Sequence, residues 1–245
     1  INIVTLEDPV EYKMDGVNQI QVNTDAGLTF ASGLRSILRQ DPDVVMVGEI
    51  RDAETANLAV QAALTGHLVF STLHTNSAAG ILPRLIDMGI EPFLIASTLN
   101  TVIGQRLVRR VAERREAYQT TDLATTEVKQ IVGNILPQTS AEVAKVSEDL
   151  GYPSLPLANS PSFTMVKGVD TDEAPGGYSG RAGIYETISV DDDIQKLIVA
   201  HATSGDIMRV AKMKGTVTMR QDGALKALSG ITTMEEVDRV ASDLA

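Results

Sequence analysis

An apolar run that ends in an acidic residue constrains this chain more than any other feature. The run is Val44–Val47, preceded by Asp41-Pro42-Asp43 and followed by Gly48-Glu49-Ile50-Arg51-Asp52. Four apolar residues without polar alternation predict a strand buried on both faces, which is typical of parallel sheets. In open α/β folds the chemistry lies beyond the carboxyl ends of such strands, where Glu49 could act on water or on a phosphate-bound metal ion. A surface acid after a strand is also common, and for the run alone that alternative stays open.

Strand and helix signals alternate from Ile1 to about Val111, which predicts an α/β fold with a largely parallel sheet and covering helices. Thr29 is suited to cap the first of the helices, and Gly66 to end the second. The expected elements are strands over 3–6, 44–47 and 67–73, and helices over 30–38, 53–64, 78–88 and from 92 onward.

The character of the chain changes between about Ala112 and Gly177, where five prolines interrupt it and only 140–150 is periodic. Regular helices are expected again after Ser189, with Thr233 and Glu236 in capping-box spacing before the last one. We therefore expect three parts. They are a core over 1–111, a small insertion subdomain over 112–177, and a C-terminal helical subdomain over 178–245.

Composition limits the function classes. A net charge of −11 and 4% aromatic residues argue against broad contact with nucleic acid. The absence of cysteine excludes disulfides and thiolate metal sites and suits a reducing cytoplasm. No apolar stretch is long enough to cross a bilayer, so we expect no direct membrane insertion. The chain opens at Ile1 inside an expected strand, which suggests a piece of a longer protein.

Three segments place acidic or imidazole side chains at the ends of expected strands. They are 5–12, which holds Glu7 and Asp8, 41–52, which holds Glu49, and 65–76, which holds His67 and His74. The two histidines bracket one strand and would lie roughly 20 Å apart, so they are not expected to share a metal ion. His74 is expected at the carboxyl edge, near Glu7 and Glu49.

In order and spacing, these segments resemble the Asp box, the Walker B region and the His box of the secretion ATPases of type II secretion and type IV pilus systems, the GspE/PilB/PilT group. Residues 105–109 and 177–186 match as well, so the resemblance covers most of the chain. It implies a RecA-like P-loop NTPase core, hydrolysis of ATP with Mg²⁺, and a hexameric ring at the cytoplasmic face of the inner membrane. The implied partners are further copies of the chain and an inner-membrane platform protein, without nucleic acid.

The resemblance also implies residue roles. Glu49 would orient or deprotonate the attacking water, and Glu7 would assist it or hold the metal shell. His67 and His74 would sense the γ-phosphate or bridge to a neighbouring subunit. Arg51 would pair locally or reach a phosphate.

Structural alternatives stay open for several of these residues. Asp8 is a nucleotide-binding candidate, but Asp8, Asp41 and Asp43 are also suited to cap turns beside proline. His67 has the alternative of a hydrogen-bonded residue at a strand edge. A further set of arginines is expected to form a solvated or interface face, namely Arg109, Arg110, Arg114 and Arg115.

Two departures from the family pattern matter. The chain contains no Gly-x-x-x-x-Gly-Lys-Ser/Thr loop, which cradles the phosphates in such enzymes, so the 245 residues alone are expected to bind and hydrolyse ATP poorly. The two Cys-x-x-Cys pairs that hold zinc in many members are absent, so we expect no metal site and an insertion held by packing alone.

The predicted function is that of a pilus-assembly (extension) ATPase, because the insertion favours the GspE/PilB branch over the shorter retraction motors. A type II secretion ATPase and a catalytically silent scaffold of the same fold remain alternatives. A DNA-translocating ring ATPase is a further rival, which the acidic balance disfavours and a salt-dependent DNA-binding assay would test.

Overall fold

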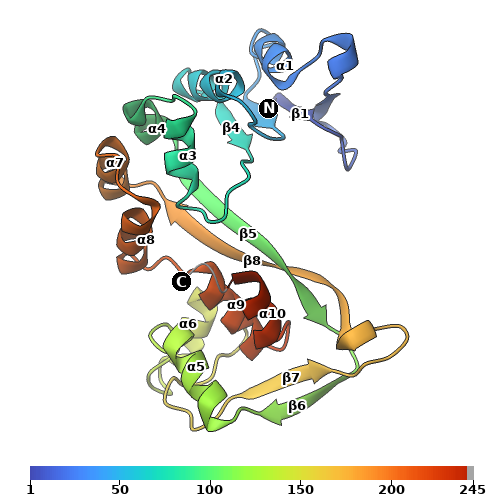
Figure 1. Cartoon of the computed structure of the whole chain (residues 1–245), viewed down its shortest axis with the longest axis vertical. Helices are drawn as coiled ribbons and strands as arrows, with labels where there is room; N and C mark the ends of the chain where they lie inside the picture. Colours follow the sequence, from blue (N-terminus) through green and yellow to red (C-terminus); the bar gives the residue numbers. More distant parts are fainter. Residues whose placement is uncertain (242–245) are drawn as a thin grey trace. The chain divides into compact units, whose positions relative to one another are not determined.

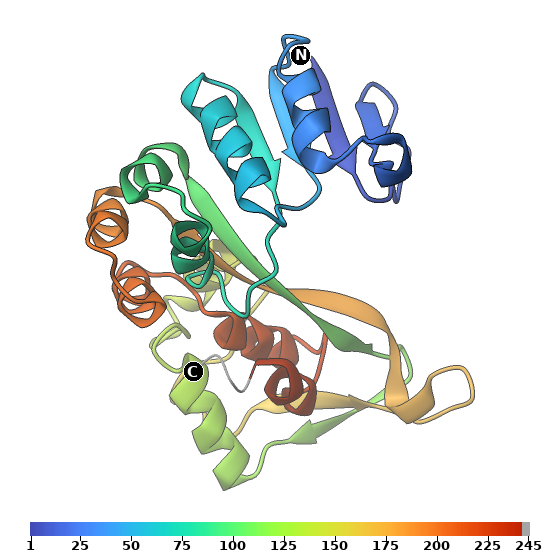
Figure 2. The same ribbon diagram turned by 45° about the horizontal axis from the view of Figure 1, so that its top comes forward.

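Two separate stretches of the chain build each of the two units in the computed structural model, which describes residues 1–241 (Figures 1 and 2). Unit 1 comprises Ile1–Val102 and Ile188–Lys214, and unit 2 comprises Ile103–Thr187 and the chain from Gly215 onward. This partition differs from the predicted parts 1–111, 112–177 and 178–245, whose division stays a prediction. Residues 242–245 of the last part lie outside the described residues.

The three predicted strands of unit 1 and one further strand, β2, form a fully parallel sheet in the order β2-β1-β3-β4. The strands are β1 (Ile3–Glu7), β2 (Asn18–Gln21), β3 (Val44–Val47) and β4 (Leu68–Ser71). Leu6 lies opposite Val47, and Val47 lies opposite Ser71. The carboxyl ends of the three strands therefore meet at one edge of the sheet. The alternation of strands and helices predicted this arrangement, and the structure confirms it.

Helices α1 (Phe30–Ile37) and α2 (Ala53–Leu64) pack on one face of this sheet, where the chain is coloured blue in Figure 1. Thr29 caps α1 through a capping box with Ser32, as expected from its side chain. Asp52 caps α2 by accepting a hydrogen bond from the backbone N–H of Thr55 at 2.7 Å. The core of this layer consists of Val4, Leu6, Phe30, Leu34, Ile37, Val45, Val47 and Ala59.

The opposite face of the sheet is only partly covered in the described chain. Leu68 and Phe70 alternate with the inward positions of β4 and are 50% and 55% exposed. Successive side chains of a β-strand point to opposite faces of the sheet. The central strands β1 and β3 are therefore buried or half-buried on both faces, whereas the edge strand β4 is exposed on one face.

Four further helices give unit 1 a second apolar core. They are α3 (Ile81–Asp87), α4 (Pro92–Thr98), α7 (Asp192–Val199) and α8 (Ser204–Met213). Ile90 and Ile95 of the first stretch pack in this core with Ile194, Ile198 and Ile207 of the second. Asp191 caps α7 by accepting from the N–H groups of the first turn, as the acidic run predicted. Unit 1 therefore needs both of its stretches to bury its apolar helices.

Four strands that the sequence did not predict lie wholly or mainly in unit 2, and two of them reach with one end into unit 1. They are β5 (Thr101–Val111) paired with β8 (Tyr178–Ser189), and β6 (Arg115–Gln119) paired with β7 (Thr164–Gly168). The helices of unit 2 are α5 (Asp122–Val132), α6 (Val143–Asp149), α9 (Met219–Leu228) and α10 (Met234–Ala241), and short 3-10 turns lie at Thr24–Ala26 in unit 1 and Pro175–Gly177 in unit 2. Buried positions alternate along β8 at 184, 186 and 188, which is the period of a strand. Regular helices resume at Asp192, after Ser189, as expected, whereas the strand over the first twelve residues of the predicted C-terminal part was not foreseen.

Two half-exposed arginines and the buried carboxylate of Glu236 form an ion-pair network that fixes α10 to β5 in unit 2. The carboxylate of Glu236 accepts hydrogen bonds from the backbone N–H of Arg109 at 2.8 Å and from the guanidinium groups of Arg109 and Arg239. The Arg109 guanidinium also lies 4.1 Å from the ring centroid of Tyr178. The expected capping box is half formed, because Thr233 caps α10 while the Glu236 carboxylate turns to the arginines. Arg109 therefore holds α10 to β5 while half of its side chain stays exposed, which agrees with the expected solvated or interface face.

Residues of the predicted insertion contribute to an apolar core of unit 2. Val128, Val132, Phe163 and Met165 form a core with Leu225 of α9. None of the helices within residues 1–241 has both the length and the apolar composition needed to cross a membrane.

Candidate functional site

The carboxyl edge of the parallel sheet gathers most of the predicted site residues. The segment after β3 is held against the end of β4, since Ile50 N–H donates to the Thr72 carbonyl at 2.9 Å and the Thr72 hydroxyl donates to the Gly48 carbonyl at 2.6 Å. Gly48 also permits a close approach to β1, because a Cβ there would lie 3.1 Å from the Leu6 carbonyl oxygen. The backbone on both sides of Glu49 is thereby fixed.

Four charged or titratable side chains form what we call the edge cluster, namely Asp8, Glu49, Arg51 and His74. Arg51 Nη2 donates to Glu49 Oε1 at 2.5 Å and lies 3.5 Å from Asp8 Oδ2. His74 Nε2 lies 3.4 Å from Glu49 Oε2, so each carboxylate oxygen of Glu49 faces a nitrogen. The predicted proximity of His74 and Glu49 is confirmed.

Burial differs strongly within the edge cluster. The Glu49 side chain is 17% exposed, whereas those of Arg51 and His74 are 57% and 88% exposed. The acid is thus held in the protein while its two nitrogen partners face solvent. A ligand that arrives at this edge would meet Arg51 and His74 before it meets Glu49.

The electrostatics keep Glu49 ionised. The hydrogen bond from Arg51 lowers the pKa of the Glu49 carboxyl, partial burial opposes this effect, and His74 adds to the lowering. The same contact raises the pKa of Arg51. An anionic carboxylate of this kind can accept a hydrogen bond from water, and a guanidinium can bind a phosphate oxygen.

Glu7 lies at the end of β1. The hydrogen bonds of its carboxylate within the described residues go to side chains outside the edge cluster. Its Oε1 accepts hydrogen bonds from the Thr5 hydroxyl at 2.5 Å and from Gln19 Nε2 at 3.0 Å. Gln19 lies on β2, a strand that the sequence reading did not identify. The expected closeness of Glu7 to His74 stays a prediction.

His67 lies at the other end of β4 from His74, as the sequence reading expected. Its Nδ1 lies 2.9 Å from the Ala62 carbonyl and 3.0 Å from the Thr65 hydroxyl, which ties the end of α2 to the start of the strand. This geometry favours the alternative of a hydrogen-bonded strand-edge residue. Its role at a phosphate or toward a second subunit stays a prediction.

Asp41 and Asp43 lie directly before β3, at the edge of the sheet where its strands begin. Asp43 Oδ2 accepts a hydrogen bond from the backbone N–H of Asn2 at 2.6 Å, and Asp41 has a positive φ of 50° beside Pro42. The Asp43 contact joins the start of β1 to the start of β3 and is not a turn cap, so the turn-capping alternative for these two residues stays a prediction. Asp8 differs from them, because its carboxylate faces Arg51.

Two polar residues of this edge were not singled out from the sequence. Gln19 positions Glu7, and Thr72 fixes the backbone of Gly48. A weak signal for Gln19 existed in the alternation Asn18-Gln19-Ile20-Gln21 after Gly16. Thr72 sits inside the third segment, but nothing in a single sequence marks its hydroxyl as a backbone clamp.

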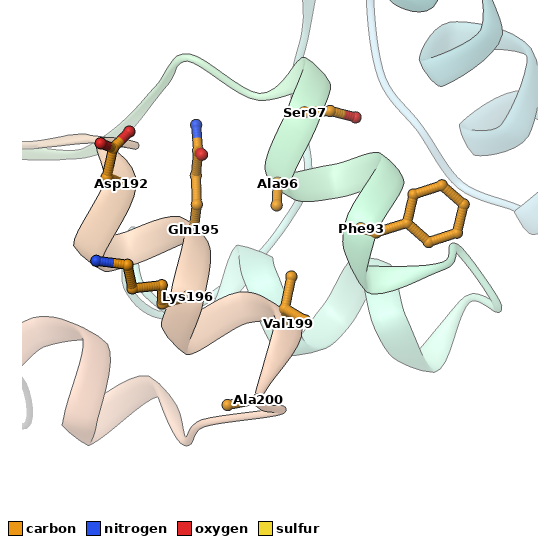
Figure 3. A pocket seen from close by; sticks show the side chains of 8 residues that line it. All are labelled: Phe93, Ala96, Ser97, Asp192, Gln195, Lys196, Val199 and Ala200. Atoms are coloured by element: carbon orange, nitrogen blue, oxygen red, sulfur yellow. The ribbon is translucent and has the colours of Figure 1, made fainter.

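A separate groove of about 560 Å³ lies between α4 and α7 in unit 1. Figure 3 shows Phe93 and Ala96 on one helix and Gln195, Lys196 and Val199 on the other. Lys196 pairs with Asp193 at 3.3 Å, and the walls are mainly apolar. No member of the edge cluster lines this groove, so it is not the site at the sheet edge.

The edge cluster can supply an acid, a cation and an imidazole, but it does not form a metal cage. Among residues 1–241 no three His, Cys, Asp or Glu side chains converge to hold a metal ion. Mg²⁺ in phosphoryl-transfer sites is usually held by one or two carboxylates together with substrate phosphates and water. Asp8, Glu49 and Arg51 therefore fit a metal–phosphate complex that arrives as one ligand.

Comparison with known proteins gives consistent matches along the chain. The family model described as "Type II/IV secretion system protein" matches residues 1–239. The type IV pilus assembly ATPase PilB of Thermus thermophilus is 47% identical over 237 residues, which are 96% of this chain and 24% of that protein. Type II secretion system protein E of Pectobacterium carotovorum is 47% identical over 244 residues, which are 99% of this chain and 43% of that protein. The chain thus spans less than half of each of these relatives.

Solved structures agree with these matches. The crystal structure of the pilus retraction motor PilT with bound ADP has a TM-score of 0.62 and 26% identity, and the match covers 98% of this chain and 52% of that chain. The X-ray structure of the Legionella pneumophila ATPase DotB has a TM-score of 0.61 and 22% identity, with coverage of 99% and 52%. The α/β fold with a parallel sheet is therefore that of the RecA-like P-loop ATPases, as the sequence predicted.

Proposed function

The chain belongs to the Type II/IV secretion system protein family, and from this premise we propose that it is part of the ATPase of a type IV pilus assembly motor. Relatives named PilB and relatives named Type II secretion system protein E match nearly all of it. The observation that carries the proposal is the approach of Arg51 and His74 to the two carboxylate oxygens of Glu49.

In the proposed reaction, Glu49 orients the water that attacks the γ-phosphorus of ATP. The new bond joins the water oxygen to phosphorus, the bond to the β,γ-bridging oxygen breaks, and ADP and phosphate leave. Glu49 can accept a hydrogen bond from the water because its low pKa keeps it anionic at neutral pH. Glu49 therefore assists the reaction mainly by positioning the water, and less by its affinity for the proton of that water.

The other predicted residues have supporting roles in this proposal. Arg51 and Asp8 lie where a phosphate and its ion would be bound, and His74 would report the γ-phosphate from the exposed side of Glu49. Glu7, held by Gln19, would act on the ion only through water. When it is bound, Mg²⁺ neutralises charge that develops on the phosphoryl oxygens.

We further propose that the whole protein works as a hexameric ring at the cytoplasmic face of the inner membrane. Its partner would be a platform protein of the pilus machine. Secretion by a type II system is the second candidate, because a relative of that name is as similar in sequence as the pilus protein, at 47% identity for each. A catalytically silent scaffold is the remaining alternative.

The deciding experiment is steady-state Mg-ATP hydrolysis by a protein extended upstream by about fifty residues, compared with the 245-residue chain. We expect activity in the extended protein and little in the shorter one. Glu49→Gln should leave ATP binding nearly intact and slow hydrolysis by about a hundredfold, the scale of losing a positioned acid–base group. Glu91→Gln, an exposed glutamate at the start of α4, serves as the matched control.

A folded extended protein without activity would refute the enzyme and support the scaffold. Normal hydrolysis by Glu49→Gln would instead refute the role of this residue while leaving the activity in place.

A further inference from the structure

The ion pairs that the Arg51 guanidinium makes with Glu49 and Asp8 both use one nitrogen. Nη2 lies 2.5 Å from Glu49 Oε1 and 3.5 Å from Asp8 Oδ2. A guanidinium carries five N–H donors in a planar fork. The side chain is 57% exposed, so a ligand from solvent can reach it.

The backbone around Arg51 is anchored, whereas its side chain is not. Ile50 N–H donates to the Thr72 carbonyl at 2.9 Å on one side, and Asp52 caps α2 on the other. A phosphate that attracted Arg51 would therefore rotate the side chain and leave the chain trace in place. Phe30, whose ring centroid lies 5.8 Å from the guanidinium carbon, gives the side chain an aromatic face along which to move.

The contact with Arg51 limits what Glu49 can do. Oε1 already accepts a short charge-assisted hydrogen bond, and Oε2 faces His74 at 3.4 Å. A water molecule must compete with the guanidinium for Oε1. Phosphate oxygens are good partners for the arginine fork, so an arriving phosphoryl group would compete for the same cation.

We propose that Arg51 is a positioning residue that latches Glu49 in the absence of nucleotide and releases it when a phosphoryl group binds the guanidinium. This inference rests on the proposed function, since it assumes that the ligand at the edge is ATP. The released Oε1 orients water, and His74 continues to hold Oε2. The latch couples the presence of the phosphate to the readiness of the acid, so that water is not aligned before ATP is bound.

The test is a double-mutant cycle on the extended protein, with the variants Glu49→Gln and Arg51→Gln alone and together. Thermal unfolding is measured without nucleotide and with saturating Mg-ATP, at a temperature ramp fast enough to limit turnover. The matched control is Arg209→Gln, which removes an exposed arginine that pairs with Asp206 at 2.8 Å on α8.

The latch predicts that the effects of the two substitutions are non-additive without nucleotide and become additive with Mg-ATP. Arg51→Gln should also weaken ATP binding by about tenfold, the scale of one charge-assisted hydrogen bond, and leave ADP binding nearly unchanged. Arg51→Lys, which keeps the charge but loses the fork, should recover part of the ATP affinity.

Each other result has a definite meaning. Non-additivity that persists unchanged with Mg-ATP would identify a permanent ion pair and overturn the latch. Additivity in both states would overturn it as well, because the pair would then carry no energy. A wild-type extended protein whose unfolding does not respond to Mg-ATP would overturn the proposed function and the latch together.

Discussion

Replacing Glu236 by glutamine is expected to destabilise unit 2 by about 2–3 kcal/mol at neutral pH. The Glu236 side chain is 1% exposed and accepts hydrogen bonds from Arg109 N at 2.8 Å, Arg109 Nη2 at 2.7 Å, and Arg239 Nε and Nη2 at 2.9 and 2.7 Å. Glutamine keeps the shape but replaces one acceptor oxygen by an NH₂ group. That group would face N–H donors and leave an arginine unmatched.

The magnitude follows from the proton affinity of the carboxylate. The hydrogen bond from Arg239 lowers the pKa of Glu236 most, burial opposes it, and Arg109 adds to the lowering, which brings the pKa from 4.5 to about 2. Since each tenfold change in proton affinity is worth about 1.4 kcal/mol, the folded environment favours the carboxylate by roughly 3 kcal/mol. Both arginine side chains are about half exposed, at 50% and 54%, so solvent screening reduces this value.

The pH dependence has a fixed sign. The pKa of Glu236 is lower in the folded chain than in the unfolded chain, so its contribution is fully present above the unfolded value of 4.5. The contribution is lost as the pH falls toward about 2. The difference in unfolding free energy between wild type and Glu236→Gln should therefore be constant from about pH 6 to 8 and shrink below about pH 4.5.

Tyrosine fluorescence offers a probe that is confined largely to unit 2. The chain has no tryptophan and five tyrosines, of which only Tyr12 lies in unit 1. Tyr178 also lies against the Arg109 guanidinium. Urea unfolding of the wild type and the variant should be followed at several pH values. Glu235→Gln, an exposed neighbour on α10, is the matched control and should change the unfolding free energy by less than about 0.5 kcal/mol.

Two results would refute the reasoning. One is equal stability of Glu236→Gln and Glu235→Gln at pH 7, which would mean that the ion-pair network adds nothing over a neutral side chain. The other is a difference in unfolding free energy between wild type and Glu236→Gln that stays constant between pH 6 and pH 3. Such a difference would come from packing and not from the charge of Glu236.

Three further outcomes follow from unit 1. Gly48→Ala should destabilise the chain by about 1–3 kcal/mol and lower hydrolysis in the extended protein, because its Cβ would press on the Leu6 carbonyl 3.1 Å away; unchanged urea unfolding would contradict this. Asp52→Ala should cost about 1 kcal/mol through loss of the α2 cap, as measured by urea unfolding against Asp52→Asn, which keeps a capping oxygen. His74→Ala should slow hydrolysis by the extended protein by tenfold or more, whereas His67→Ala should leave it within about twofold; the reverse order would restore His67 to the site.

The sheet of unit 1 could be predicted because its signals are local. The run Val44–Val47 lies between Asp-Pro and Gly-Glu, and Thr29 and Asp52 carry side chains that cap helices. Each of these signals acts within about four residues, which is the range that a single sequence displays. The parallel order of β1, β3 and β4 then follows from the intervening helices.

The strands of unit 2 could not be found in the same way. β5 and β8 are separated by 66 residues of chain, from Ala112 to Gly177. No short hairpin turn connects them, so the sequence carries no local signal for their pairing. The alternation of buried positions in β8 was visible, but glycines and charged residues within it weaken the strand signal. Long-range pairing is decided by packing, which a single sequence does not show.

The sequence predicted which residues belong to the candidate site better than it predicted which of their side chains contact one another. The spacing of Glu49 and Arg51 left open whether the arginine pairs locally or reaches a phosphate, and the structure records the local pair. The hydrogen bond that Glu7 accepts comes from Gln19 of β2, a strand too short and polar to be recognised. Side-chain direction at a strand end is set by such neighbours.

The interleaving of the two units has a consequence for synthesis on the ribosome. The apolar helices α3 and α4 are translated with the first stretch of unit 1, but α7 and α8, which complete their core, follow only after the 85 residues from Ile103 to Thr187. At roughly 5–20 residues per second, this delay lasts about 4 to 17 seconds. During that time the isoleucine faces of α3 and α4 have no permanent cover, so the nascent chain should present a binding site for chaperones that recognise exposed apolar segments.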